Sequence, residues 1–225
     1  MVAKTRRMAR LLTALLASSV TLVTTMTASA NTILFANITN QQENPAINTG
    51  LPGAPTTTTA IGNLPRPASF GTATFNLNDA QTSMTFSATI FNIDFTGTQT
   101  PDVNDNLLNA HIHAGAGVTA TTNGSVVWGF IGSPFNDNNP NDMVLTPFTT
   151  GVGGTVSGKW DAPEGNNTTL AAQLPFILSG RSYINFHTTQ FTGGEIRGAL
   201  IPEPSTFLVG LGLSAVIGLR RRRTA

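Results

Sequence analysis

The chain has 225 residues, of which 40% are hydrophobic and only 10% are charged, and it contains 22 glycines, 13 prolines and no cysteine. This composition argues against a helical bundle and excludes disulfide stabilisation, and it is typical of short strands joined by turns. Basic residues gather at the two ends, so residues 11–202 carry four basic and ten acidic side chains, the wrong sign for a protein that binds nucleic acid.

The first thirty residues have the three parts of a secretory signal peptide. A basic segment with Lys4 and three arginines precedes an apolar run from Leu11 to Val23, and a small-residue Ala-Ser-Ala sequence ends at Ala30. We therefore expect residues 1–30 to direct export through the inner membrane and to be removed after Ala30. A permanent membrane anchor is the alternative, but the apolar run is shorter than the roughly twenty residues of a membrane-spanning helix.

Residues 31–68 combine an opening strand with a long loop. The alternation of side chains in Thr32–Thr39 predicts a strand. Residues 40–67 are rich in proline, glycine, threonine and asparagine and have no hydrophobic periodicity. We expect this second stretch to form a long surface loop.

Strand patterns dominate residues 69–201. Alternating side chains predict a hairpin of two strands, Ser69–Leu77 and Ser83–Ile93. Further strands are expected at Asn109–Ala114, Ser125–Ile131, Thr155–Asp161, Arg181–Thr188 and Glu195–Ile201. One short helix is expected at Thr168–Leu178, ended by Gly180. The pattern predicts an all-β fold, an antiparallel Greek-key β-sandwich.

Two of the three histidines in the chain stand one residue apart on a predicted strand. Alternate residues of a strand point to the same face, so His111 and His113 point together. The same spacing aligns Tyr183, Asn185 and His187 on a second strand. If these two strands are near neighbours, all three imidazoles can converge.

The histidines belong to a longer series of motifs. Small residues follow the His-x-His pair, and an Asn-Gly pair at 123–124 precedes an apolar strand. A Tyr-x-Asn-x-His-Thr motif begins at Tyr183, and a closing Gly-Glu-Ile-Arg-Gly motif contains Gly194, Glu195 and Arg197. Together these motifs resemble the CHRD domain, first described in chordin and common in exported bacterial proteins. The resemblance assigns residues 69–201 to that domain and implies an immunoglobulin-like or superoxide-dismutase-like β-sandwich.

A metal centre is one interpretation of His111, His113 and His187. Imidazole is a good ligand for copper and zinc, and a His-x-His pair on a strand also begins the copper site of copper-zinc superoxide dismutase. Full dismutase chemistry needs further ligands that three histidines cannot supply. The favoured interpretation is structural, with imidazoles that satisfy buried polar atoms and fix strand register. We therefore expect no cofactor, with copper or zinc as the alternative.

Several other side chains have two interpretations. Glu195 and Arg197 are expected to pair with each other or to brace the sheet. Trp160 fits either core packing or stacking on a carbohydrate, and the Asn- and Asp-rich residues 136–142 fit either a loop or a calcium site. The sequence has no cysteine nucleophile, G-x-S-x-G elbow or phosphate-binding loop. We therefore expect a protein that is not an enzyme.

The C-terminal residues 202–225 have three parts in a fixed order. Pro202, Glu203 and Pro204 precede an apolar stretch from Phe207 to Leu219, and four arginines follow. This arrangement closely resembles the PEP-CTERM sorting signal of Gram-negative bacteria. The resemblance implies a short transmembrane helix, transient inner-membrane anchoring and processing by an exosortase-type enzyme. A plain C-terminal membrane anchor is the alternative.

These features predict an exported, non-enzymatic protein that is sorted to the cell surface or to an exopolysaccharide matrix. Its expected role is structural or binding, with exopolysaccharide or surface proteins as partners. The alternative is a metal-binding or redox protein that uses the three histidines.

Overall fold

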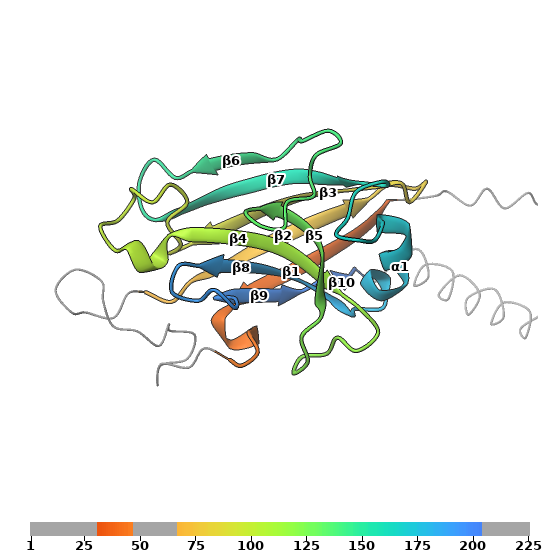
Figure 1. The fold of residues 1–225 in the computed structure, drawn as a ribbon, viewed down its shortest axis with the longest axis horizontal. Helices are drawn as coiled ribbons and strands as arrows, with labels where there is room; N and C mark the ends of the chain where they lie inside the picture. The colour runs from red at the N-terminus through yellow and green to blue at the C-terminus, as the bar shows by residue number, and fades with distance from the viewer. Residues whose placement is uncertain (1–30, 47–66, 204–225) are drawn as a thin grey trace, which may run out of the picture.

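The computed structural model describes residues 31–46 and 67–203 (Figure 1). The predicted signal peptide, most of the predicted loop at 40–67 and the predicted transmembrane helix of the C-terminal tail lie outside these residues. Within the described part of the chain, no helix is long and apolar enough to cross a membrane.

Strands make up most of the described fold. They are β1 (Thr32–Thr39), β2 (Phe70–Leu77), β3 (Ser83–Phe91), β4 (Leu107–Ala114), β5 (Ser125–Ile131), β6 (Val144–Pro147), β7 (Gly153–Asp161), β8 (Ser182–Thr188), β9 (Ile196–Ala199) and β10 (Ile201–Pro202). The helix α1 spans Leu170–Leu178, and the two short 3-10 helices are η1 (Asn40–Gln42) and η3 (Val103–Asp105). The predicted strands and the predicted helix are confirmed to within a few residues. β6 is an addition, because it lies in a segment without a predicted strand.

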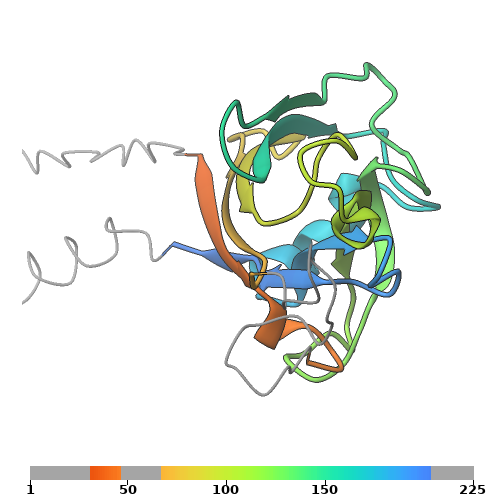
Figure 2. The same ribbon diagram turned by 90° about the vertical axis from the view of Figure 1, so that its left-hand side faces the viewer.

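All the strands belong to one antiparallel sheet. Their order is β5-β4-β8-β9-β1-β2-β3-β7-β6, and β10 pairs with β1 beside this path. The end-on view in Figure 2 shows that the sheet curls round, so that its two halves face each other. The mostly β, antiparallel class is therefore confirmed, whereas the immunoglobulin-like or superoxide-dismutase-like sandwich type stays a prediction.

The core fills the space inside the curled sheet. Trp128 on β5 stacks on Trp160 on β7 with ring centroids 5.6 Å apart, although these strands lie near opposite edges of the sheet. Phe86 on β3 contacts both Trp128 and Phe130. Trp128, Trp160 and Phe130 are fully buried, and burying such rings is a major source of folding free energy. Core packing thus holds the two halves of the sheet together.

The helix α1 adds a third apolar surface to this core. Thr169 caps its N-terminus by accepting a hydrogen bond from the Ala172 amide, as expected of an N-cap threonine. Leu170, Leu174 and Ile177 are its buried residues. The core therefore takes up the inner face of the sheet and one face of the helix, and leaves the outer face of β4 and β8 to polar side chains.

Candidate functional site

The three histidines lie on the outer face of the sheet, on two neighbouring strands. β4 and β8 pair directly, with His111 opposite Asn185 and His113 opposite Tyr183. Ile112, between the two histidines, belongs to the core. Because successive side chains of a strand point to opposite faces, His111 and His113 share the face that β8 gives to His187. The predicted convergence of the histidines is confirmed.

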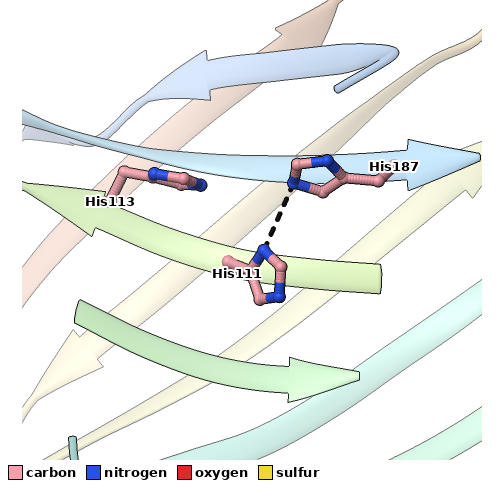
Figure 3. Close-up of side chains that lie close together, drawn as sticks. All are labelled: His111, His113 and His187. Atoms are coloured by element: carbon pink, nitrogen blue, oxygen red, sulfur yellow. Dashed lines mark hydrogen bonds between the residues drawn. The ribbon is translucent and has the colours of Figure 1, made fainter. Parts of the chain in front are cut away.

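The cluster is compact and buried beneath loops. One nitrogen from each of His111, His113 and His187 lies within 4.8 Å of the other two. Nδ1 of His111 is 3.2 Å from Nε2 of His187, and Figure 3 shows the His113 ring directed toward the same place. The three side chains are 3%, 8% and 7% exposed, respectively. Such burial shields the three rings from most contact with bulk water.

A backbone carbonyl from a loop contacts the other nitrogen of each ring. Nε2 of His111 lies 3.0 Å from the Ser133 carbonyl, Nδ1 of His113 lies 3.0 Å from that of Gly124, and Nδ1 of His187 lies 3.0 Å from that of Thr192. A carbonyl oxygen can only accept a hydrogen bond. In each ring the nitrogen facing the carbonyl therefore carries the proton, and the remaining nitrogen carries a lone pair when the ring is neutral.

Burial keeps the rings neutral at pH 7. It lowers the pKa of His111 from 6.5 to about 4, helped by the charges that His187 and His113 would carry. Burial likewise lowers the pKa of His113 to about 4, although its hydrogen bond to Gly124 acts in the opposite direction. The pKa of His187 is also lowered, again chiefly by burial. All three imidazoles are therefore in the form that binds metal ions.

Three lone pairs consequently converge on one small space. The lone pairs are on Nδ1 of His111, Nε2 of His113 and Nε2 of His187. The 3.2 Å contact between His111 and His187 has no proton to share, and Nε2 of His113 is buried without a hydrogen-bond partner. Outer carbonyls that fix the tautomer and orientation of histidines are a recurring feature of metal sites. The donor set thus fits a cation at its centre.

A layer of polar and aromatic contacts surrounds the histidines. The Tyr183 ring stacks on His113 with centroids 4.6 Å apart and planes 5° from parallel, and the Arg197 guanidinium lies 4.4 Å above the centre of the Tyr183 ring. The Asn185 amide donates to Oε2 of Glu43 at 3.0 Å. Burial raises the pKa of Glu43, against the opposing effects of the Asn44 amide, the Arg197 charge and Asn185.

The expected pairing of Glu195 with Arg197 is wrong. The Arg197 guanidinium donates to Oδ1 of Asn123 and to the carbonyls of Thr119 and Ala120. Glu195 accepts hydrogen bonds from the hydroxyls of two other residues, Thr188 at 2.6 Å and Ser69. Glu195 directly precedes β9, where its backbone amide pairs with β8, so the strand alternation does not bring the two side chains together. Both residues nevertheless brace the sheet.

Several contributors to the site were not identifiable from the sequence. Glu43 and the buried Asn40 come from the start of the predicted surface loop, and that part of the loop packs against the site. The three carbonyls come from loops, and any residue type can supply a carbonyl. Gly194 has φ +126° and lies against the side chains of Glu43 and Asn185, so its lack of a side chain makes room for them.

The structure also bears on Trp160, on residues 136–142 and on the motif that begins at Pro202. Trp160 is fully buried and donates to the Glu164 carbonyl, so it packs in the core and offers no surface for a carbohydrate. Among the described residues the three histidines are the one group of three or more His, Cys, Asp or Glu side chains close enough to share an ion. This finding does not cover amide or backbone oxygens, and the calcium site at residues 136–142 stays a prediction. Pro202 ends β10 and Glu203 bonds to β1, while Pro204 lies outside the described residues.

Comparison with known proteins gives one match. A family model, the CHRD domain, matches residues 34–200. This segment begins in β1, at the centre of the sheet, and ends just before β10. No curated protein and no solved structure matches the chain.

Proposed function

Because the chain belongs to the CHRD domain family, we propose that it is an exported binding protein whose three histidines hold a transition metal ion. Membership of this family points to a secreted or structural role. The ligands are Nδ1 of His111, Nε2 of His113 and Nε2 of His187. The proposal assigns a binding role and no chemical reaction.

The observation that carries the metal proposal is the set of three inward lone pairs. Without a cation, the closest pair of nitrogens is a contact between two acceptors, and the lone pair of His113 is buried without a donor. Both arrangements cost free energy in a buried site. A bound cation turns the same three lone pairs into ligands and leaves the carbonyl contacts of Ser133, Gly124 and Thr192 intact.

The distances support this assignment. Two nitrogens bound to zinc at about 2.05 Å with a tetrahedral angle lie about 3.3 Å apart, close to the 3.2 Å between His111 and His187. Two ligands of one ion at that bond length can be no more than about 4.1 Å apart. The widest separation in the cluster, up to 4.8 Å, must therefore shrink by about 0.7 Å to reach this limit and by about 1.5 Å to reach the tetrahedral separation.

The ligand types favour copper or zinc. Imidazole suits both ions, whereas calcium and magnesium prefer oxygen ligands. Three protein ligands also leave a coordination position for water or an external molecule. The neutral rings add no charge to the ion, so the metal keeps its full positive charge beside Arg197.

Export and sorting complete the proposal. Residues 1–30 are proposed to act as a cleaved signal peptide, and residues 202–225 as a PEP-CTERM signal that an exosortase-type enzyme processes. The mature protein then reaches the cell surface or an exopolysaccharide matrix. Mass spectrometry of the protein released from the producing cells tests this directly, because both ends of its sequence should be missing. Recovery of the intact chain with both ends present would refute the sorting route.

Metal analysis of purified protein tests the site. We expect about one equivalent of copper or zinc in the wild type, and less than a tenth of that in His113→Gln and His187→Gln. Ser87→Ala, on the exposed outer face of β3, is the control and should retain the metal. Circular dichroism establishes that each variant is folded. Equal metal content in the wild type and both histidine variants would refute the metal site, and a loss of stability alone would support the structural role of the three carbonyl contacts.

A further inference from the structure

Asn185 lies on the same face of β8 as His187 and directly opposite His111 on β4. We propose that Asn185 selects the external molecule that takes the open position on the metal. Its side-chain oxygen, Oδ1, accepts a hydrogen bond from that molecule, so the position favours water or another small ligand with an O–H or N–H group. This inference rests on the proposed metal site and names the class of its external ligand.

The register of the sheet places Asn185 among the three histidines. It stands two residues before His187 and two residues after Tyr183, whose ring stacks on His113. Side chains two residues apart on a strand share a face, and the residues on either side of Asn185 belong to the core. Across the strand pair Asn185 is directly opposite His111, where Cβ atoms are about 4.5–5.5 Å apart. The Asn185 side chain therefore adjoins the cluster on the outer face.

One end of the Asn185 amide is hydrogen-bonded and the other end is not. Its Nδ2 donates to Oε2 of Glu43 at 3.0 Å. Asn185 is 2% exposed, and its Oδ1 is buried without a hydrogen-bond partner among the described residues. An amide oxygen can only accept a hydrogen bond, and a buried acceptor without a donor costs free energy. This oxygen is therefore available to a donor from outside the chain.

The neighbouring histidines do not supply that donor. Each ring directs its N–H group to a loop carbonyl, at Ser133, Gly124 or Thr192. The inward nitrogens are acceptors, as is the amide oxygen beside them. A cation can bind the three nitrogens but cannot donate a hydrogen bond to the amide. A water on that cation does both, because its oxygen is a ligand and its hydrogen bonds to Oδ1.

A cavity gives small molecules an approach from the Asn185 side. Its volume is about 540 Å³, and its lining includes Glu43, Asn123, Thr192 and Gly194. Gly194 lies directly against the amide, since a Cβ added there would be 2.7 Å from Oδ1 and 2.8 Å from Nδ2 of Asn185. The amide therefore lies immediately behind the wall of this cavity.

An acceptor beside the open position discriminates between ligands by their hydrogens. Ammonia, like water, can bind a metal ion and still donate a hydrogen bond to Oδ1. Azide also binds metal ions through nitrogen but has no hydrogen to donate. Replacing a well-ordered water by a ligand that cannot reproduce its hydrogen bonds lowers affinity. The Asn185 oxygen should therefore favour ammonia over azide.

Ligand titrations of the full-length protein loaded with copper(II) test this proposal. Copper(II) binds nitrogen sites more tightly than zinc does, and its visible absorption reports the bound ligand. Azide and ammonia are titrated separately into the wild type and into Asn185→Leu, which has an uncharged side chain of similar size. The affinity for azide relative to ammonia should rise at least tenfold in the variant, because one hydrogen bond to a buried acceptor is removed.

Two further variants make the comparison specific. Asn185→Ala removes the same oxygen with a smaller side chain, so the relative affinity for azide should rise there as well. Ser87→Ala should keep the wild-type ratio. The ratio of two affinities within one protein is independent of how much copper that protein retains, and circular dichroism establishes that each variant is folded.

Two results would overturn the inference, and they have different meanings. An unchanged ratio of azide to ammonia affinity in copper-loaded Asn185→Leu or Asn185→Ala would refute the role of Asn185 and leave the metal site in place. A wild-type protein that binds no copper would refute the proposed function, and the ligand position with it.

Discussion

Nδ1 of His111 and Nε2 of His187 lie 3.2 Å apart, and each ring presents its N–H group to a carbonyl on its other side. The contact therefore joins two acceptors. Protonation of one ring would turn this unfavourable contact into a hydrogen bond, but it would place a charge in a buried position. A metal ion removes the unfavourable contact by binding both nitrogens. The same geometry governs the pH dependence of the protein and its response to metal.

As the pH falls, the metal-free protein should begin to lose stability at a higher pH than the titration of ordinary carboxylates would cause. The pKa values of His111 and His113 fall from 6.5 to about 4 on folding, so the unfolded chain binds more protons between these values. Their contribution to stability is complete above pH 6.5 and is lost as the pH falls toward 4, by up to about 1.4 kcal/mol per pH unit for each group. Urea unfolding of chelator-treated protein from pH 8 to pH 4.5 measures this loss.

His113→Gln provides the matched comparison for that experiment. It removes one of the three histidines whose pKa is lowered on folding, so its stability should fall less steeply below pH 6.5 than that of the wild type. The nearby Glu43, Tyr183 and Arg197 are present in both proteins. Identical pH profiles for the two proteins would contradict the assignment of the acid sensitivity to the histidine cluster.

Asp137 should have the opposite pH dependence. Its side chain is fully buried, and burial together with the charges of Asp142 and Glu164 raises its pKa from 3.8 to about 6. The folded state then binds more protons between these values, so ionisation of Asp137 lowers stability as the pH rises through 6. Asp137→Asn should stabilise the protein by about 1–2 kcal/mol at pH 8 and lose this advantage near pH 4.

Denaturant unfolding at the two pH values checks the Asp137 prediction. Asp79→Asn makes the same chemical change on an exposed residue of the β2–β3 turn and should leave stability almost unchanged. A gain for Asp137→Asn that is equally large at pH 4 and pH 8 would show that its cause is not the removed charge.

The strands and the meeting of the histidines could be predicted from the sequence for a simple reason. Alternation of side chains is a local property, so the spacing of His111 and His113 determines that they share a face. Their proximity to His187 followed once β4 and β8 proved to be neighbours. The pairing of strands far apart in sequence depends on the whole core, and the continuous curl of the sheet is not encoded in any single segment.

The surroundings of the histidines could not be predicted because they depend on loop conformation. Ser133, Gly124 and Thr192 contribute backbone carbonyls, which have no sequence signature. Glu43 reaches the site from a segment whose composition predicts only a surface loop. The predicted pairing of Glu195 with Arg197 was mistaken because strand alternation was extended to Glu195, which lies one residue before the start of β9.

The stability of the protein should be sensitive to replacing the Glu164 carboxylate with an amide of the same shape. It is 3% exposed, and its Oε1 accepts from the amides of Asn138 and Asn139, while Oε2 accepts from Asp161 and from the Trp128 indole. A glutamine has one acceptor oxygen, so two of these four donors would face an NH₂ group. Glu164→Gln should cost about 3 kcal/mol.

Chemical denaturation of Glu164→Gln measures that loss. The same substitution at the exposed Glu203 is the control and should change stability by less than about 0.5 kcal/mol. A Glu164→Gln protein as stable as the control would mean that the four hydrogen bonds do not hold the loop at 137–140 against Trp128.

Gly194 should not tolerate a side chain, whereas the neighbouring Gly193 should tolerate one. At φ +126° an alanine is strained, and its Cβ would lie 2.6 Å from Oε2 of Glu43 and 2.7 Å from Oδ1 of Asn185. We expect Gly194→Ala to destabilise the protein by about 2–3 kcal/mol. Gly193→Ala has nothing within 4 Å of the new Cβ and serves as the control in thermal unfolding. Equal melting temperatures for the two variants would contradict the close packing at Gly194.

Metal should stabilise the protein in proportion to its occupancy. An ion that binds only the folded state adds about 2.7 kcal/mol at a free concentration of one hundred times Kd, which corresponds to a rise in Tm of about 5–10 °C for a chain of this size. Because the pKa values of His111 and His113 are about 4, protons compete weakly at pH 6, and most of the shift should remain there. Scanning calorimetry with and without zinc or copper, at pH 7 and pH 6, measures the rise in Tm.

His113→Gln should show no comparable rise in Tm on addition of metal, and Ser87→Ala should match the wild type. The same rise in all three proteins would place the ion somewhere other than among the histidines.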